Sequence, residues 1–326
     1  MSSLSVNNTT RKNKFDAGEF FRRYGTTLIF LILVACAASL SSSFFSERNI
    51  MNVLRQVSGT GIMAVGMLLV IMTRGIDLSV GSIAALGSVM SAIVVSQYSA
   101  GASIGIVLLV GAVCGIVSGF LVAYLRLQPF VMTLAMMAVA RGIALIVSNG
   151  QPIMMGEQGG AITSFGTTAW FGVPLPVVLM LAIFAVAAIL LNLTRFGRLV
   201  KAIGSNEEAV HLSGIPVARY VLAVYAISGA LAALAGVIIT SRSGVGSATV
   251  GVGAELDVIA AVVIGGASLA GGRGGVFNTL LGVLVFGVIG NIMNLINVPG
   301  YHQQVCMGVI IVIAMLLQKG TGWLKR

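Results

Sequence analysis

Only 9% of the 326 residues are charged, so candidates for chemistry are few. Asp77 and Ser79 lie in Gly-Ile-Asp-Leu-Ser-Val-Gly at 75–81, a polar break between two apolar stretches. Its glycines permit unwound backbone, which inside lipid must face protein or water. Two interpretations of Asp77 follow: it lines or gates a conduit, or it caps the next helix by accepting hydrogen bonds from free backbone amides.

Three more polar residues lie deep in apolar stretches. Arg141 has no acid nearby in sequence, and a cation at such depth costs at least ~2.5 kcal/mol unless it is paired or reaches water. It is either a structural residue satisfied by helix-end carbonyls or a substrate contact. Asn291 and Asn294 are three residues apart and share a helix face. They either join neighbouring helices or form a polar stripe facing a solute such as a sugar.

Other chemistry lacks the residues it needs. Cys36, Cys114 and Cys306 lie in apolar runs without a Cys-x-x-Cys pair, and His211 and His302 are far apart in the chain. We therefore expect no metal site. The sequence has no phosphate-binding Gly-x-x-x-x-Gly-Lys-Ser/Thr run, nucleophile–base pair or carboxylate dyad. No catalytic residue and no cofactor are expected.

The composition places these residues in a membrane. Hydrophobic residues make up 57% of the chain and the mean hydropathy is +1.04. Soluble domains carry about 25% charged residues, so this chain could not form a polar shell in water. The prediction is an all-α integral membrane protein, and water-soluble enzymes are excluded.

Stretches without charge, each near the roughly 20 residues that cross a bilayer, predict about ten helices. One stretch encloses Arg141. The predicted single polytopic domain covers residues 26–320, between cytoplasmic tails at 1–25 and 321–326. The predicted spans lie at 24–46, 56–73, two within 78–125, 128–148, 172–193, 220–241, 258–272 and two within 274–318.

The positive charges orient the spans. With the basic N-terminus inside, fifteen Lys and Arg residues fall on the inner side, and only Arg48, Arg55 and Arg242 fall outside. Such a bias marks the cytoplasmic side, so both ends are predicted to be cytoplasmic. The net charge of +10 then reflects topology and not nucleic-acid binding.

A weak internal repeat sets predicted helices 2–5 against helices 7–10. An offset of 180 residues aligns Asp77 with Asp257 and Ser88 with Ser268. An offset of five spans reverses direction, as in transporters built from inverted repeats. Chance similarity between helices rich in Gly, Ala and Ser is the alternative.

The one long inner loop, at 194–219, contains a predicted short helix. Asn206, Glu207 and Glu208 resemble a helix start, with acids near the positive end of the helix dipole. Gly214 and Pro216 then end it. Such a helix is either a solvated surface element or a lever that a cytoplasmic motor grips.

Three segments resemble one family: GMLLVIMTRGIDLSVGS at 66–82, GSNEEAVHLSGIPV at 204–217 and ELDVIAAVVIGGASLAGGRGG at 255–275. They look like the permease subunits of bacterial ribose-type ABC importers, which are similar in architecture to the vitamin B12-type (type II) importers. The resemblance implies a homodimer in the inner membrane, with ten helices per subunit. It implies two partners, an ATPase subunit with two nucleotide-binding domains and a periplasmic sugar-binding protein. It also assigns contact with the ATPase to Asn206, Glu207, Glu208 and Gly214.

The resemblance favours D-ribose as the solute, and another sugar or sugar-like signal of the same family is the alternative. A second class is an ion-coupled secondary transporter with Asp77 and Arg141 as a relay. A membrane enzyme would need convergent titratable groups, of which the chain has too few.

Overall fold

The computed structural model describes the backbone of residues 17–323 and the side chains of residues 25–310 and 312. Most of the two predicted tails lies outside these ranges, as do the side chains of their basic residues. The first helix begins at Ala17, so residues 17–25 of the predicted N-terminal tail are helical.

A helix occupies each of the ten predicted segments. By length and composition, six of the helices in the described part of the chain can cross a membrane: α2, α4, α5, α7, α10 and α12. Residues 25–40 and 80–94 form shorter apolar helices. The ten are α1 (Ala17–Leu40), α2 (Glu47–Met72), α3 (Val80–Val94), α4 (Ala100–Ala123), α5 (Pro129–Val147), α7 (Leu175–Leu193), α10 (Val217–Ser243), α11 (Ala254–Ile264), α12 (Val276–Leu295) and α13 (Gly300–Trp323).

The connections hold further short elements, of which only the short helix of the inner loop was predicted from the sequence. The loop after α5 forms β1 (Ile153–Met154), the 3-10 turn η1 (Glu157–Gly159) and α6 (Gly160–Thr167). β2 (Ala169–Trp170) and β3 (Val173–Pro174) make an antiparallel hairpin, and β1 pairs antiparallel with β4 (Val245–Gly246). The inner loop holds α8 (Arg195–Ser205) and α9 (Glu207–Leu212).

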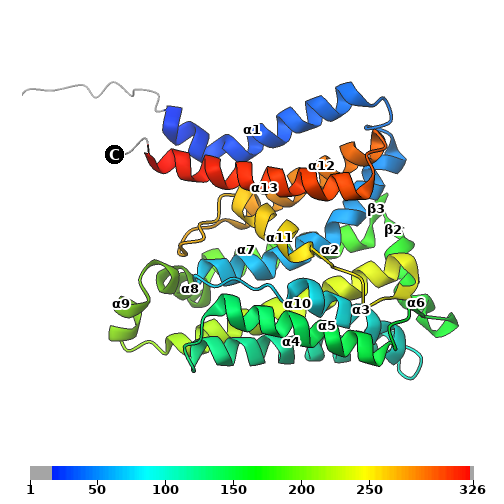
Figure 1. Cartoon of the computed structure of the whole chain (residues 1–326), viewed down its shortest axis with the longest axis horizontal. Helices are drawn as coiled ribbons and strands as arrows, with labels where there is room; N and C mark the ends of the chain where they lie inside the picture. The colour runs from blue at the N-terminus through cyan, green and yellow to red at the C-terminus, as the bar shows by residue number, and fades with distance from the viewer. Residues whose placement is uncertain (1–16, 324–326) are drawn as a thin grey trace, which may run out of the picture.

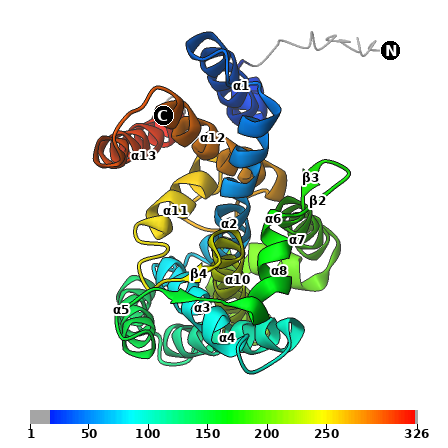
Figure 2. The same cartoon turned by 90° about the vertical axis from the view of Figure 1, so that its right-hand side faces the viewer.

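The long helices run between two ends of the molecule. Figure 1 shows α8 and α9 at one end, with the start of α1 and the end of α13 also on that side, and β2, β3 and α6 at the other end. In Figure 2, α2 and α10 lie centrally, with α3, α4 and α5 below them and α11, α12 and α13 above.

Helices α2 and α10 form the core. Most of α2 from Val57 to Met72 is buried, and Tyr225 of α10 is 0% exposed. Glycines permit this packing: a Cβ on Gly66 would lie 2.9 Å from Ser228 Cα, and one on Gly87 would lie 2.5 Å from Ala233 O. Small residues at such contacts let helix backbones approach closely without a side chain between them.

Each core helix packs against helices from the other half of the chain. Helices α3 and α4, which follow α2 in sequence, pack on α10. Helices α11 and α12, which follow α10, pack on α2. Each half of the chain therefore builds its layer on the core helix of the other half.

Arginines lie near both ends of α2. Arg74, directly after α2, donates to carbonyls at the end of α8. Arg55, near the start of α2, lies beside Arg242, which donates to its carbonyl oxygen at 3.3 Å. Helix α2 spans roughly 25 Å from Arg55 to Met72 at 1.5 Å per residue, close to the thickness of a hydrocarbon core.

Candidate functional site

Asp77 connects the break between α2 and α3 to α10. It is 1% exposed; Oδ1 accepts from the Ser79 amide at 3.0 Å and the Ser79 hydroxyl at 2.5 Å. Oδ2 accepts from the Ser228 hydroxyl of α10 at 2.8 Å. The N-cap residue of α3 is Ser79, so Asp77 lies two residues before the observed cap position. The bond from the Ser79 amide is the backbone contact that the capping interpretation expected. Asp77 thus holds the turn that leads into the helix.

Arg141 of α5 is satisfied by the backbone of a distant loop. Its Nη1 donates to the carbonyl oxygens of Ala248 at 2.5 Å and Val250 at 2.7 Å. Both carbonyls belong to the irregular segment between β4 and α11 and not to a helix end. The contact fixes α5 against the connection that leads into α11.

Asn291 and Asn294 bond to different neighbours. Asn291 and Asn49 of α2 exchange two amide hydrogen bonds, at 2.7 and 3.0 Å. Asn294 Oδ1 accepts from Gln303 Nε2 of α13 at 2.8 Å. This geometry favours a role in joining helices over a shared stripe that faces a solute.

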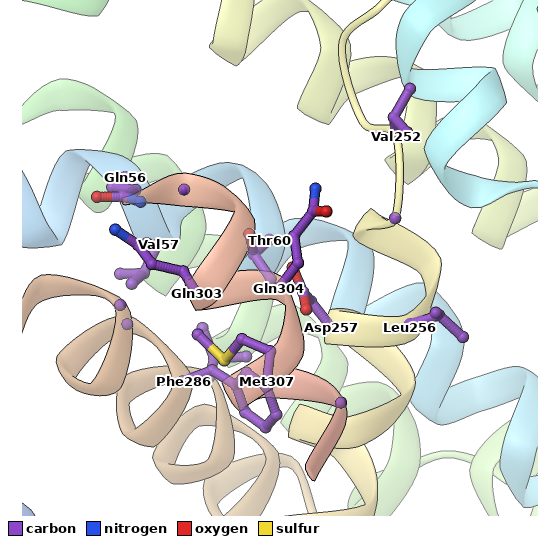
Figure 3. Close-up of a pocket in the computed structure, with 16 residues that line it drawn as sticks. Gln56, Val57, Thr60, Val252, Leu256, Asp257, Phe286, Gln303, Gln304 and Met307 are labelled. Atoms are coloured by element: carbon purple, nitrogen blue, oxygen red, sulfur yellow. The ribbon is translucent and has the colours of Figure 1, made fainter. Parts of the chain in front are cut away.

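A pocket of about 550 Å³ lies between α2, α11, α12 and α13 (Figure 3). The start of α13, which helps to line it, lies in the half of the molecule away from α8 and α9 (Figure 1). None of the five predicted pathway residues lines it. Its volume is in the usual range for small-molecule sites. Its polar side chains are Gln56, Thr60, Asp257, Gln303 and Gln304, and its larger apolar ones include Val57, Phe286 and Met307.

Four of these polar side chains are free to bind a solute. Gln303 is held by Asn294 and by the carbonyl oxygen of Val298. No side-chain hydrogen bond between described residues engages the other four, which are Gln56, Thr60, Asp257 and Gln304. Amides and a hydroxyl offer donors and acceptors together, and a carboxylate adds acceptors. This set suits a neutral solute rich in hydroxyl groups.

The sequence held signals for this pocket. Gln303 and Gln304 are adjacent amides inside an apolar stretch, and Asp257 is the repeat partner of Asp77. Both carboxylate oxygens of Asp77 accept hydrogen bonds within the protein, whereas Asp257 lines the pocket. Single polar residues inside a long helix, such as Gln56 and Thr60, give no comparable signal.

The short helix of the inner loop is where the sequence predicts it. Asn206 caps α9, its Oδ1 accepting from the Ala209 amide at 3.0 Å, and exposed Glu207 and Glu208 fill the first turn. Gly214 follows the helix with φ +78°, a conformation that favours glycine. The predicted start and end of α9 are confirmed. Helix α8, which precedes it, was not predicted from the sequence.

The fold and the pocket define the class. Six long apolar helices indicate a multi-pass membrane protein, and a pocket with polar side chains lies between two of them, α2 and α12, and the helices α11 and α13. The family model described as "Branched-chain amino acid transport system / permease component" matches residues 49–315. The chain belongs to this family of transport permeases.

Curated relatives cover almost the whole chain. The ribose import permease protein RbsC of Haemophilus influenzae is 41% identical over 316 residues, 96% of this chain and 98% of the relative. That of Escherichia coli K12 is 44% identical over 290 residues, 88% and 90% of the two chains. The L-arabinose transport system permease protein AraH of E. coli K12 is 36% identical over 335 residues, 100% and 99%. No solved structure matches the chain.

Asp77→Asn tests the connection to α10. An amide keeps the shape but replaces charge-assisted hydrogen bonds with neutral ones, which are weaker by about 1 kcal/mol each. We expect normal membrane insertion, a lower melting temperature and reduced solute uptake. Ser228→Ala, which removes only the bond to α10, should give part of the same loss. Undiminished uptake by Asp77→Asn at wild-type protein level would remove Asp77 from the mechanism.

Proposed function

We propose that this chain is the membrane permease subunit of an ATP-binding cassette importer that moves a monosaccharide, D-ribose, across the bacterial inner membrane. One observation carries the proposal: relatives named ribose import permeases are 41% and 44% identical over 96% and 88% of the chain. Relatives named L-arabinose permeases, at 36% identity, make L-arabinose the second candidate solute.

The proposed topology has ten spans in a type II permease fold, with both ends in the cytoplasm. Helix α8, which Arg74 contacts at the C-terminal end of α2, adds Arg195, Arg198 and Lys201 there, against Arg55 and Arg242 near the other end. This excess supports the orientation, because positive residues gather on the cytoplasmic side. The crossed packing of α3 and α4 on α10, and of α11 and α12 on α2, supports an inverted repeat.

The pocket is proposed as part of the solute route. It lies in the half of the molecule assigned to the periplasmic side, where a sugar-binding protein would deliver its cargo. Free amides of Gln56 and Gln304 can bond sugar hydroxyls, while Phe286 and Met307 offer apolar surface to the sugar ring. A permease must release its cargo, and a few weak, flexible contacts serve that better than a tight site.

The five residues predicted for the pathway take supporting roles in this proposal. Asp77 and Ser79 shape the break beside α10, and Arg141 fixes the loop that enters α11. Asn291 and Asn294 hold α12 to α2 and α13, next to the pocket. These residues shape the walls of the route and set how far the walls can move during gating.

The inner loop is proposed as the contact with a separate ATPase subunit that carries two nucleotide-binding domains. Helix α9 lies at one end of the molecule, with Glu207 and Glu208 exposed and Leu212 79% exposed. Asn206 and Gly214 fix where this helix starts and stops. A second copy of the chain completes the proposed transporter.

Gln304→Leu tests the pocket. Losing the amide removes a hydrogen bond to the solute but leaves the side chain close to its original size. The KM for ribose uptake should therefore rise about 5-fold, as loss of about 1 kcal/mol implies. Uptake of labelled ribose by cells with equal permease levels measures it. Gln97→Leu, the same change at an exposed loop residue outside the pocket, is the control. Equal KM values for the two variants would exclude Gln304 from the route.

Reconstitution tests the whole proposal. Vesicles holding this chain and its ATPase, with the binding protein outside and ATP inside, should accumulate ribose without any ion gradient. The same vesicles with L-arabinose test the second candidate. Accumulation by the chain alone, driven by a proton or sodium gradient, would contradict the proposal and favour a secondary transporter.

A further inference from the structure

Arg74 ties together three segments that are distant in sequence. Its Nε donates to the carbonyl oxygens of Gly204 at 2.7 Å and Ala270 at 3.1 Å. Its Nη2 donates to the carbonyl oxygen of Ser205 at 2.7 Å. One guanidinium therefore connects the C-terminal end of α2, the last turn of α8 and the loop between α11 and α12.

The backbones of these segments are also in direct contact. The Gly272 amide donates to the Met72 carbonyl oxygen at 3.0 Å. A Cβ on Gly272 would lie 2.9 Å from the Ser205 amide nitrogen, so no side chain fits between the loop and the end of α8. We call this contact of Arg74 with Met72, residues 204–205 and residues 270–272 the Arg74 joint.

Two features indicate that the joint is held in one arrangement. Arg74 has φ +63°, a left-handed conformation that costs a non-glycine residue about 1–3 kcal/mol and persists only where its surroundings enforce it. The carbonyls that it binds include the last ones of α8, which the helix leaves unpaired and which carry partial negative charge. A guanidinium presents several donors in a fixed plane and can bind two segments at once, which an ammonium does less well.

The joint lies between the exposed inner helix and the pocket. Asn206, which caps α9, directly follows Ser205. Helix α2 runs from the joint to Thr60 and Gln56, and the loop at 270–272 follows α11, which carries Asp257. A displacement of α9 thus has a continuous path to two of the four helices that line the pocket.

We propose that Arg74 is a positioning residue for energy coupling: it makes α8 and α9 move with α2 and α11, so that force applied to α9 changes the pocket. The inference rests on the proposed function, since it needs an ATPase that acts on α9. Without the guanidinium, α8 would move independently of α2, and ATP would be hydrolysed with little transport.

The test compares Arg74→Gln and Arg74→Lys with a matched control in the reconstituted transporter. Arg126 is also an exposed arginine with positive φ (+54°), three residues after the end of α4, and no side-chain hydrogen bond between described residues engages it. Arg126→Gln therefore loses a similar charge on the same side without opening the joint. The measured quantity is ribose moved per ATP hydrolysed, with ATPase retention on the affinity-purified permease measured in parallel.

Arg74→Gln should lower the ratio at least about 5-fold, the small end of allosteric coupling, while retaining the ATPase. Arg74→Lys should fall between this variant and wild type, and Arg126→Gln should match wild type. A wild-type ratio in Arg74→Gln overturns the inference, as does an equal loss in Arg126→Gln. A wild-type complex that does not transport at all would instead sink the proposed function.

Hydrogen exchange on the same complexes supplies a second readout, which remains available in Arg74→Lys if Arg74→Gln does not fold. Opening the joint should speed exchange of the amides at 202–213 and 270–272, while those at 228–240 in the buried part of α10 stay protected. Unchanged exchange at 202–213 in Arg74→Lys, together with a wild-type transport ratio, would also overturn the inference.

Discussion

Irregular backbone within a bilayer must find its hydrogen bonds inside the protein, and this constraint explains the placement of Asp77 and Arg141. The break between α2 and α3 is bonded by Asp77. The connection that enters α11 is bonded by Arg141, and the loop that leaves α11 is bonded by Arg74. Each of these three charged groups serves a place where the chain is not helical.

Some polar side chains are hydrogen-bonded to other parts of the protein, and others have no such bond. Asp77 and Asn291 have their polar atoms bonded to neighbouring elements. Thr60, Asp257 and Gln304 face a pocket with no side-chain hydrogen bond between described residues. A transported solute can bind only polar groups that the fold has not already used. The pocket, more than the buried charges, is therefore where solute contact is expected.

Much of the fold follows from the sequence, because a chain that crosses lipid must satisfy its backbone hydrogen bonds within helices. Charge-free stretches had to be helices, and a helix lies at every predicted segment. The end points of α9 follow from local chemistry, a capping Asn206 and a left-handed Gly214, which need no tertiary information. Helix α8 was missed because Arg195, Arg198 and Lys201 make its segment resemble a polar loop, although its buried face packs on α7 and α2.

The site was less predictable, since partners depend on which helices become neighbours. Asn291 and Asn294 share a helix face, yet they bond to α2 and α13 respectively. The partner of Arg141 is a pair of loop carbonyls, which no side-chain pattern can reveal. For the pocket, the internal repeat paired Asp77 with Asp257. It could not show that Asp77 would be hydrogen-bonded to α10 while Asp257 lines the pocket.

The central claim is that the pocket between α2, α11, α12 and α13 lies on the route of the solute, open to the outer side. It is tested by labelling Gln304→Cys with a membrane-impermeant thiol reagent, in a chain whose Cys36, Cys114 and Cys306 are replaced by alanine. We expect labelling from the periplasmic side, and we expect ribose to slow it when the binding protein and the ATPase are present. Labelling that is unaffected by ribose, or that occurs only from the cytoplasmic side, would contradict it.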